Sequence, residues 1–177
     1  MKLSIVISCY NEEDTLETIL LKLINLKINL EKEIIIIDDC SIDRSIEIIK
    51  RLQGSYDFIK LIENKPNRGK GFCLRKGFEA SSGDIILIQD ADLEYDPAEY
   101  CKLLQPILDD KADVVYGSRF IGSGAHRVLF YWHYLGNKLL TLCSNMFTNL
   151  NLTDMETCYK VFRKDIIKNI RLEEDRF

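Results

Sequence analysis

Short apolar runs alternate along the chain with segments in which hydrophobic residues recur at helical spacing. A short run of β-branched and aliphatic residues is typical of a buried strand, whereas apolar residues three and four positions apart indicate one face of a helix. We therefore predict strands at residues 3–8, 33–38, 58–63, 84–89 and 112–116. Helices are predicted from about residue 12, over residues 43–52 and 70–80, and from about residue 97. This alternation predicts an α/β fold, with a mostly parallel central sheet and helices on both faces.

The alternation stops after residue 116. Residues 117–127 contain three glycines and two arginines without periodicity, which is typical of a mobile loop. A long amphipathic segment follows from about residue 130, and a further strand is predicted near residues 157–162. Because no interdomain linker is visible, we expect a single domain over residues 1–177. The ending after residues 173–176 (EEDR) suggests that a C-terminal part is missing.

Composition and charge narrow the class of protein. Of the 177 residues, 46% are hydrophobic and 29% are charged, as expected for a globular domain with a full core. The net charge of −4 gives no general basic field, so no nucleic-acid partner is expected. The six cysteines lack metal-binding spacing and are expected to be reduced, and no signal peptide is visible. These features favour a cytoplasmic protein.

Carboxylates follow two of the predicted strands directly. Asp90 and Asp92 stand one residue apart after a buried run, and Asp38 and Asp39 follow four isoleucines. Ligands of open α/β sheets bind outside the carboxyl ends of the strands, so this edge is the expected site. Two carboxylates with a small residue between them suit Mg²⁺ or Mn²⁺ held together with substrate phosphates. The first pair alternatively forms a solvated turn, and the second a turn that begins a helix.

Two further loops precede helices at the same edge. Residues 10–13 (YNEE) close the first strand; they either cap a helix through Asn11 or place Tyr10 beside a nucleotide. Residues 67–71 (NRGKG) combine two glycines with two cations, including Lys70, and such a loop can approach a diphosphate closely. The spacing is not that of a P-loop, and a plain turn is the alternative. Asp154 and Glu156, near the predicted last strand, are candidate general bases or turn caps.

Taken in order, these motifs resemble family 2 glycosyltransferases with the GT-A fold, and within them the polyprenyl-phosphate and dolichyl-phosphate sugar synthases. The resemblance covers nearly the whole chain. The matching motifs are residues 5–13 (IVISCYNEE), 38–43 (DDCSID), 67–71 (NRGKG), 89–93 (QDADL), 117–120 (GSRF) and 153–160 (TDMETCYK). Cys158 stands where the family commonly has glycine, and the C-terminal membrane helices common in the subgroup do not occur in this sequence.

The resemblance implies a role for each of these residues. Tyr10, Glu12 and Asp39 or Asp38 would hold the nucleoside of a nucleotide-sugar donor. Lys70 would lie beside the donor, and Asp90 and Asp92 would carry Mg²⁺ or Mn²⁺ on its diphosphate. Catalysis would involve Asp92, Asp154 and Arg119. The phosphates would be contacted by Arg119 and Arg127, with Lys160 as a weaker candidate.

The reaction implied is transfer of a sugar, with inversion, from a donor of the UDP-glucose or GDP-mannose type to a polyprenyl or dolichyl phosphate. Such an acceptor would bring the protein to a membrane surface, as a peripheral protein at the cytoplasmic face. The loop of residues 117–127 would close over both phosphates, unless Arg119 simply pairs with a nearby acid, such as Asp90 or Asp92, and helps to hold the site together. The alternatives are a hydroxyl acceptor, which would need Asp154 as base, and, more remotely, a receiver-type signalling domain. The sequence leaves the oligomeric state open.

Overall fold

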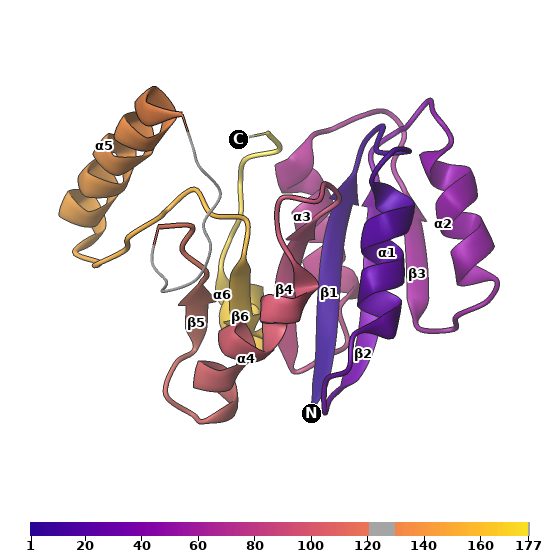
Figure 1. The fold of residues 1–177 in the computed structure, drawn as a ribbon, viewed down its shortest axis with the longest axis horizontal. Coiled ribbons are helices and arrows are strands. Elements are labelled where there is room, and N and C mark those ends of the chain that lie inside the picture. Colours follow the sequence, from indigo (N-terminus) through magenta and orange to yellow (C-terminus); the bar gives the residue numbers. More distant parts are fainter. Residues whose placement is uncertain (121–129, 177) are drawn as a thin grey trace.

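A computed structural model describes residues 1–120 and 130–176. Its described residues form a six-stranded sheet in the order β3-β2-β1-β4-β6-β5 (Figure 1). The strands are β1 (Lys2–Cys9), β2 (Glu31–Asp38), β3 (Ile59–Glu63), β4 (Ile85–Asp90), β5 (Val114–Tyr116) and β6 (Lys160–Arg163). Neighbouring strands from β3 to β4 are parallel, whereas β6 runs antiparallel to both β4 and β5. The predicted mostly parallel α/β sheet is confirmed.

Helices cover both faces of this sheet (Figure 1). They are α1 (Leu16–Asn25), α2 (Ser45–Gln53), α3 (Lys70–Ala80), the 3-10 turn η1 (Pro97–Glu99), α4 (Tyr100–Leu108), α5 (Tyr131–Thr148) and α6 (Lys164–Asn169). Helices α1, α2 and α4 lie on one face, with α3 and α6 on the other. On the α4 face the Tyr100 hydroxyl donates to Gln89 at 2.8 Å, and on the α3 face Phe78 packs edge-on against Phe162.

The central strands are buried on both faces, which explains their unbroken apolar sequence. The four isoleucines of β2 and the residues Ile5, Val6 and Ile7 of β1 are fully buried. The continuous run therefore predicts a strand in the middle of the sheet and not at its edge. With the sheet fixed in this way, the parallel strands β1, β2 and β4 end at one edge, where their loops meet.

Three features differ from the sequence prediction. Strand β6 lies between β4 and β5, so β5 does not neighbour the strand that precedes it. Helix α6 was not predicted, because six residues are too few to show a periodic pattern. Helix α1 begins at Leu16 and not near residue 12, and Asn11 does not cap it: the Asn11 side chain accepts a hydrogen bond from the Ile42 N–H at 2.9 Å.

Helix α5 lies apart from the layers around the sheet (Figure 1). It touches the rest of the molecule mainly through polar residues, and Asn137 and Thr141 are its buried side chains. Among the described residues, no helix is long and apolar enough to cross a membrane. Arg127 and most of the predicted mobile loop lie outside the described residues.

Candidate active site

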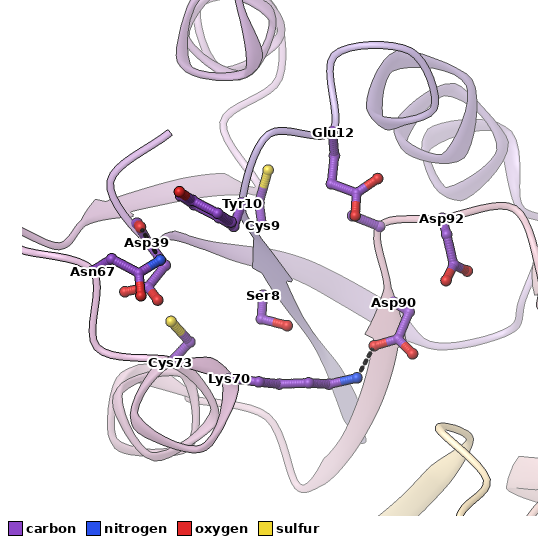
Figure 2. A pocket seen from close by; sticks show the side chains of 11 residues that line it. Ser8, Cys9, Tyr10, Glu12, Asp39, Asn67, Lys70, Cys73, Asp90 and Asp92 are labelled. Atoms are coloured by element: carbon purple, nitrogen blue, oxygen red, sulfur yellow. Dashed lines mark hydrogen bonds and ion pairs between the residues drawn. The ribbon is translucent and has the colours of Figure 1, made fainter. Parts of the chain in front are cut away.

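The carboxyl edge of the sheet carries a pocket of about 310 Å³, built by the loops after β1, β2 and β4 and by the start of α3 (Figure 2). Polar and acidic side chains converge on it from all four segments. The described residues that line it are Ser8, Cys9, Tyr10, Glu12, Asp39, Asn67, Lys70, Cys73, Asp90, Ala91 and Asp92. The pocket therefore lies at the carboxyl edge of the sheet, where the sequence predicts the site.

The loops after β1 and β2 bind each other and so form one wall. The Asn11 N–H donates to Ser41 Oγ at 3.0 Å, and the Glu12 N–H donates to Ser45 Oγ at 2.9 Å. The Glu13 N–H donates to the Asp43 carboxylate at 3.0 Å. These bonds use the backbone donors that precede α1, which explains why the helix starts late. They also hold Tyr10 and Glu12 at the rim of the pocket.

Asp38 and Asp39 lie in different surroundings. Asp39 lines the pocket, and its carboxylate accepts the N–H groups of Arg68 and Gly69 at 3.0 and 2.6 Å. Asp38 is fully buried and does not line the pocket. One of its oxygens accepts the Ser41 N–H at 3.0 Å, while Oδ1 has no hydrogen-bond partner among the described residues. Of the two, Asp39 alone is placed to meet a ligand in the pocket.

Lys70 and Asp90 form an ion pair at 2.5 Å across the floor of the pocket (Figure 2). Burial by itself lowers the pKa of Lys70, but the Asp90 carboxylate more than offsets this and the pKa is raised. The pKa of Asp92 is also raised, but for a carboxylate this shift disfavours the charged form. Burial and the charges of Asp90 and Glu94 raise its pKa, against a hydrogen bond from the Glu94 N–H. A negative charge on Asp92 is therefore destabilised by its surroundings.

This donor set fits a divalent cation bound together with a ligand. Asp90 and Asp92 supply hard oxygen donors on one wall of the pocket. No group of three or more His, Cys, Asp or Glu residues that could enclose a metal occurs in the described parts of the chain. Mg²⁺ is commonly held by one or two carboxylates plus substrate phosphates, and two carboxylates are sufficient for that arrangement. A cation would also relieve the repulsion that raises the pKa of Asp92.

The glycines before α3 have a structural reason that the sequence did not indicate. Gly69 has φ +97°, and a Cβ there would lie 2.7 Å from the Asp175 carbonyl oxygen. A Cβ on Gly71 would collide with the Glu174 carbonyl oxygen. The segment near Asp175 thus lies against the start of α3, and the Asp175 carboxylate binds Arg68 at 2.9 Å. The close approach predicted for a diphosphate at these glycines is made instead by the chain itself.

Asp154 and Arg119 form a second, separate cluster. The Asp154 carboxylate is buried and accepts the Arg119 N–H at 3.0 Å, Arg119 Nε at 2.7 Å and Arg119 Nη2 at 2.8 Å. Asn137 of α5 donates to it at 3.2 Å. Burial alone would raise the pKa of Asp154, but the Arg119 hydrogen bonds lower it. Arg119 is thus paired with a nearby acid, as the structural alternative predicts, but that acid is Asp154 and not Asp90 or Asp92.

Charged groups of both the pocket and the Arg119–Asp154 cluster act on the pKa of Lys160. Burial lowers the pKa of its ammonium, as does the charge of Lys70, while Cys158, Asp154 and Asp90 act in the opposite direction. The Lys160 ammonium lies 5.1 Å from the centre of the Tyr116 ring. It has no ion-pair partner among the described residues. A half-buried lysine without a carboxylate partner is a place where an anion can be bound.

Most of the residues singled out in the sequence are brought together, but not all. Tyr10, Glu12, Asp39, Lys70, Asp90 and Asp92 line the pocket. Asp38, Arg119 and Asp154 do not, and Arg127 lies outside the described residues. Sequence reasoning did not assign the other lining residues, which are Ser8, Cys9, Asn67, Cys73 and Ala91. Cys73 could have been found, because it follows Lys70 by three positions and so shares its helix face.

The fold and the pocket together define a class of protein. A doubly wound sheet with acidic residues on the loops of its carboxyl edge is the arrangement of GT-A glycosyltransferases, and solved structures of that class superpose on the chain. Glucosyl-3-phosphoglycerate synthase from Mycobacterium tuberculosis, in complex with Mn²⁺, UDP and glucosyl-3-phosphoglycerate, matches 96% of this chain and 59% of its own, with a TM-score of 0.73 and 18% identity. TarS from S. aureus matches 96% of this chain and 49% of its own, with a TM-score of 0.64 and 20% identity.

The chain belongs to glycosyl transferase family 2, whose model matches residues 4–171. A dolichol-phosphate mannosyltransferase of Pyrococcus furiosus is 34% identical over 124 residues, which are 70% of this chain and 35% of that protein. A probable glycosyltransferase of Bacillus subtilis, YdaM, is 35% identical over 133 residues, or 72% of this chain and 32% of that protein. The chain thus spans about a third of the length of these curated relatives. It is a glycosyltransferase domain with the GT-A fold, as the sequence motifs predict.

Proposed function

We propose that this glycosyltransferase moves a sugar from a nucleotide-diphosphate donor, of the UDP-glucose or GDP-mannose type, to a polyprenyl or dolichyl phosphate. One observation carries the choice of a phosphate acceptor. Asp154 is the carboxylate that a hydroxyl acceptor would need as a base. It is buried, it accepts three hydrogen bonds from Arg119, and these bonds lower its pKa. A carboxylate held in this way is a poor proton acceptor, and an ionised phosphate needs none.

The donor occupies the pocket in this proposal. Tyr10, Glu12 and Asp39 face the nucleoside, with the half-exposed ring of Tyr10 at the rim. Asp90 and Asp92 would hold Mg²⁺ or Mn²⁺, which would supply positive charge to the diphosphate when bound. Lys70 is then free to leave Asp90 and to contact a diphosphate oxygen. In the structure the Lys70 ammonium pairs with the Asp90 carboxylate at 2.5 Å.

The acceptor phosphate lies on the side of Lys160 and Arg119. Lys160 has no carboxylate partner among the described residues and lies in the field of both Asp90 and Asp154. Arg119 is oriented by Asp154 and remains about one-third exposed, with 30% of its side chain accessible. Asp154 is thus a positioning residue in this proposal and not a base. The expected contact of Arg127 with phosphate stays a prediction.

The chemistry then balances without proton transfer. An oxygen of the acceptor phosphate forms a bond to the anomeric carbon, and the bond from that carbon to the donor diphosphate breaks, with its electron pair leaving on the diphosphate. Inversion follows from attack on the face opposite the leaving group. The protein contributes positioning of the two anions and stabilisation of the leaving charge, which are large terms in such reactions.

An acceptor assay tests this proposal. Purified protein is incubated with UDP-glucose or GDP-mannose and Mn²⁺, with a polyprenyl phosphate in one arm and soluble saccharide acceptors in the other. Transfer to the lipid phosphate, lost after dialysis against chelator and restored by Mn²⁺, is the expected result. Transfer that survives chelation would remove the metal from the proposal, and transfer to saccharides alone would reject the phosphate acceptor.

A hydroxyl acceptor is the second candidate. It is favoured by the similarity to a poly-beta-1,6-N-acetyl-D-glucosamine synthase of Staphylococcus aureus, which is 39% identical over 90 residues, or 51% of this chain and 21% of that protein. That reaction needs a base, so Asp154→Asn would abolish it. With a phosphate acceptor, the same substitution changes the orientation of Arg119 and lowers stability, but it leaves measurable turnover.

A further inference from the structure

Helix α5 has its polar side facing the protein and its apolar side facing solvent. Asn137, Thr141 and Asn145 follow one another at helical spacing and form the inner stripe. Asn137 donates to Glu156 at 2.8 Å, Thr141 Oγ1 accepts the Met155 N–H at 3.3 Å, and Asn145 exchanges two bonds with the backbone of Leu152. This is the reverse of an ordinary surface helix, whose apolar stripe faces the core.

The opposite side is an apolar surface that nothing in the described chain covers. We name it the outer face of α5 and define it as Tyr131, Trp132, Leu135, Leu139, Leu140, Leu142, Met146 and Phe147. All of these side chains are exposed, for example Trp132 at 76%, Met146 at 74% and Phe147 at 90%. Contiguous apolar surface of this kind on a soluble protein is typical of a site for another apolar surface.

Charge indicates which kind of surface this is. The chain as a whole carries a net charge of −4, yet the sequence between Asp113 and Asp154 contains no acidic residue. The charged side chain of α5 is Lys138, next to the inner stripe. Tyr131 and Trp132 of the outer face stand in the first turn of α5, and such amphipathic rings favour the boundary between headgroups and acyl chains. A helix with a cation at its edge and an apolar outer face matches an anionic bilayer surface.

We propose that α5 lies in the interface of an anionic lipid bilayer, with its outer face among the acyl chains and its inner stripe toward the protein. The inference rests on the proposed lipid-phosphate acceptor, because it explains how that acceptor reaches the site. Asn137 bonds both Asp154 and Glu156, so the docked helix is tied directly to the Arg119 cluster. Docking through α5 sets that cluster beside the headgroup layer.

Trp132 makes the test direct, because it is the sole tryptophan of the chain. Its fluorescence is followed while vesicles of phosphatidylcholine, with or without phosphatidylglycerol, are added to the 177-residue protein. We expect a blue shift, quenching by brominated acyl chains, and co-sedimentation that is stronger with the anionic lipid. Lys138→Gln lowers binding to the anionic vesicles about fivefold, the order expected for one cation at such a surface.

Variants separate the outer face from general surface hydrophobicity. Leu139→Glu combined with Met146→Glu places two charges in the centre of the outer face and reduces vesicle binding at least about tenfold, because both side chains would otherwise enter the acyl layer. The matched control is Leu21→Glu with Leu108→Glu, two exposed leucines on α1 and α4 that add the same charge elsewhere. Equal loss in both double variants overturns the proposal.

Two further outcomes also overturn it. One is a protein that binds no vesicles and keeps Trp132 solvent-exposed. The other is a dimer, detected by light scattering, in which Trp132 is already shielded and vesicles cause no change, since a second copy would then occupy the outer face. Transfer to a water-soluble short-chain isoprenyl phosphate, measured without vesicles, tests the proposed function separately. Transfer without vesicle binding rejects the docking surface alone, and vesicle binding without any transfer rejects the proposed function alone.

Discussion

Asp38 and Asp39 are adjacent in the sequence, but the end of strand β2 turns their side chains into different environments. Asp39 reaches the pocket while accepting backbone N–H groups from the loop before α3. Asp38 points into the protein, where Oδ1 lacks a partner among the described residues. Consecutive residues of a strand point to opposite faces, so a pair of carboxylates at a strand end cannot both serve one ligand in the same way.

Asp39→Ala and Asp38→Ala should therefore separate ligand binding from stability. Asp39→Ala is expected to weaken nucleotide-sugar binding by about 1.5–3 kcal/mol, the scale of a hydrogen bond to a charged group. Asp38→Ala should leave that affinity within about threefold. Its main effect should be to lower the free energy of unfolding in urea, on the order of 1 kcal/mol. Calorimetric titration and urea unfolding of both variants check this. Equal affinities in the two variants would contradict the assignment.

Asp92→Asn should uncouple the metal from the donor. The substitution removes one anionic ligand while keeping the shape of the side chain, so metal-dependent donor binding falls and the fold is retained. Because its surroundings raise the pKa of Asp92, wild-type donor binding should already weaken at a pH above that at which an ordinary aspartate titrates. Asp96→Asn, in the same acidic segment but outside the pocket, is the control. Identical Mn²⁺ dependence in wild type and Asp92→Asn would rule this role out.

Asp154→Asn should cost stability at neutral pH and much less in acid. The folded state lowers the pKa of Asp154, so its contribution is complete above the unfolded pKa and is lost as the pH falls through the folded pKa. Removing one partner of a buried pair is expensive, but Arg119 is partly exposed, so we expect a loss of about 2 kcal/mol at pH 7. Urea unfolding from pH 7 to pH 3 measures it. A difference between wild type and variant that does not shrink toward pH 3 would contradict the prediction.

At the scale of elements, the start of α3 is held by two parts of the chain that are far apart in sequence. Asp39 accepts the Gly69 N–H from one side. On the other side the Asp175 backbone accepts the Phe72 N–H at 3.1 Å, and the Asp175 carboxylate also binds Arg75. The N–H groups that were expected to face a diphosphate are thus partly used within the protein. Asn67 and Lys70 are the side chains of this loop that line the pocket (Figure 2).

Gly69→Ala tests whether the chain near Asp175 determines this loop. Alanine at φ +97° is strained, and its Cβ would lie 2.7 Å from the Asp175 carbonyl oxygen. We expect a loss of stability of about 1–3 kcal/mol and faster hydrogen exchange at residues 68–72. Gly136→Ala is the control, because nothing lies within 4 Å of its Cβ and a helical glycine gains about 0.5–1 kcal/mol on this change. Unchanged exchange in Gly69→Ala would show that the loop tolerates displacement of the 174–176 segment.

At the scale of the whole molecule, acidic side chains are concentrated around the pocket, and this affects how a donor can bind. The carboxyl edge of the sheet gathers Glu12, Asp39, Asp90 and Asp92 around one pocket, with Lys70 as the basic side chain among the lining residues. Such a pocket repels a bare nucleotide diphosphate unless a cation accompanies it. Donor binding and metal binding are therefore expected to be mutually dependent.

A thermal-shift screen of UDP- and GDP-sugars measures this dependence and identifies the base. The matching donor with Mn²⁺ at 100 times its Kd should stabilise the protein by about 2.7 kcal/mol. The same donor with chelator, or Mn²⁺ alone, should shift the midpoint far less. A full shift by the donor in the presence of chelator would show that the pocket does not require the cation.

Local patterns in the sequence were sufficient to predict the layers of the fold and the edge of the sheet that carries the site. Mainly apolar runs place β1, β2 and β4 inside a sheet, and the polar residues that follow each run mark the point where the strand leaves it. For that reason the loops that carry Tyr10, the Asp38–Asp39 pair, Lys70, Asp90 and Asp92 could be assigned to one edge from the sequence. The family resemblance added Glu12, and the choice between Asp38 and Asp39 stayed open. The helix at Lys70–Ala80 was predicted with its observed bounds, because its start after Gly69 is a local signal.

Other features depend on contacts between segments that are far apart in sequence, and these features became visible only in the tertiary structure. Strand β6 enters between β4 and β5, Arg119 pairs with Asp154, and the chain near Asp175 fills the space left by Gly69 and Gly71. Periodicity likewise showed that the segment after residue 130 is amphipathic, but not which side of α5 faces the protein. The orientation of α5 follows from the hydrogen bonds of Asn137, Thr141 and Asn145. These bonds satisfy polar groups on the protein side, so the apolar side of the helix faces outward. Local patterns specify an element and its two faces, whereas the partner of each face is set by energies of packing and pairing between residues far apart in sequence.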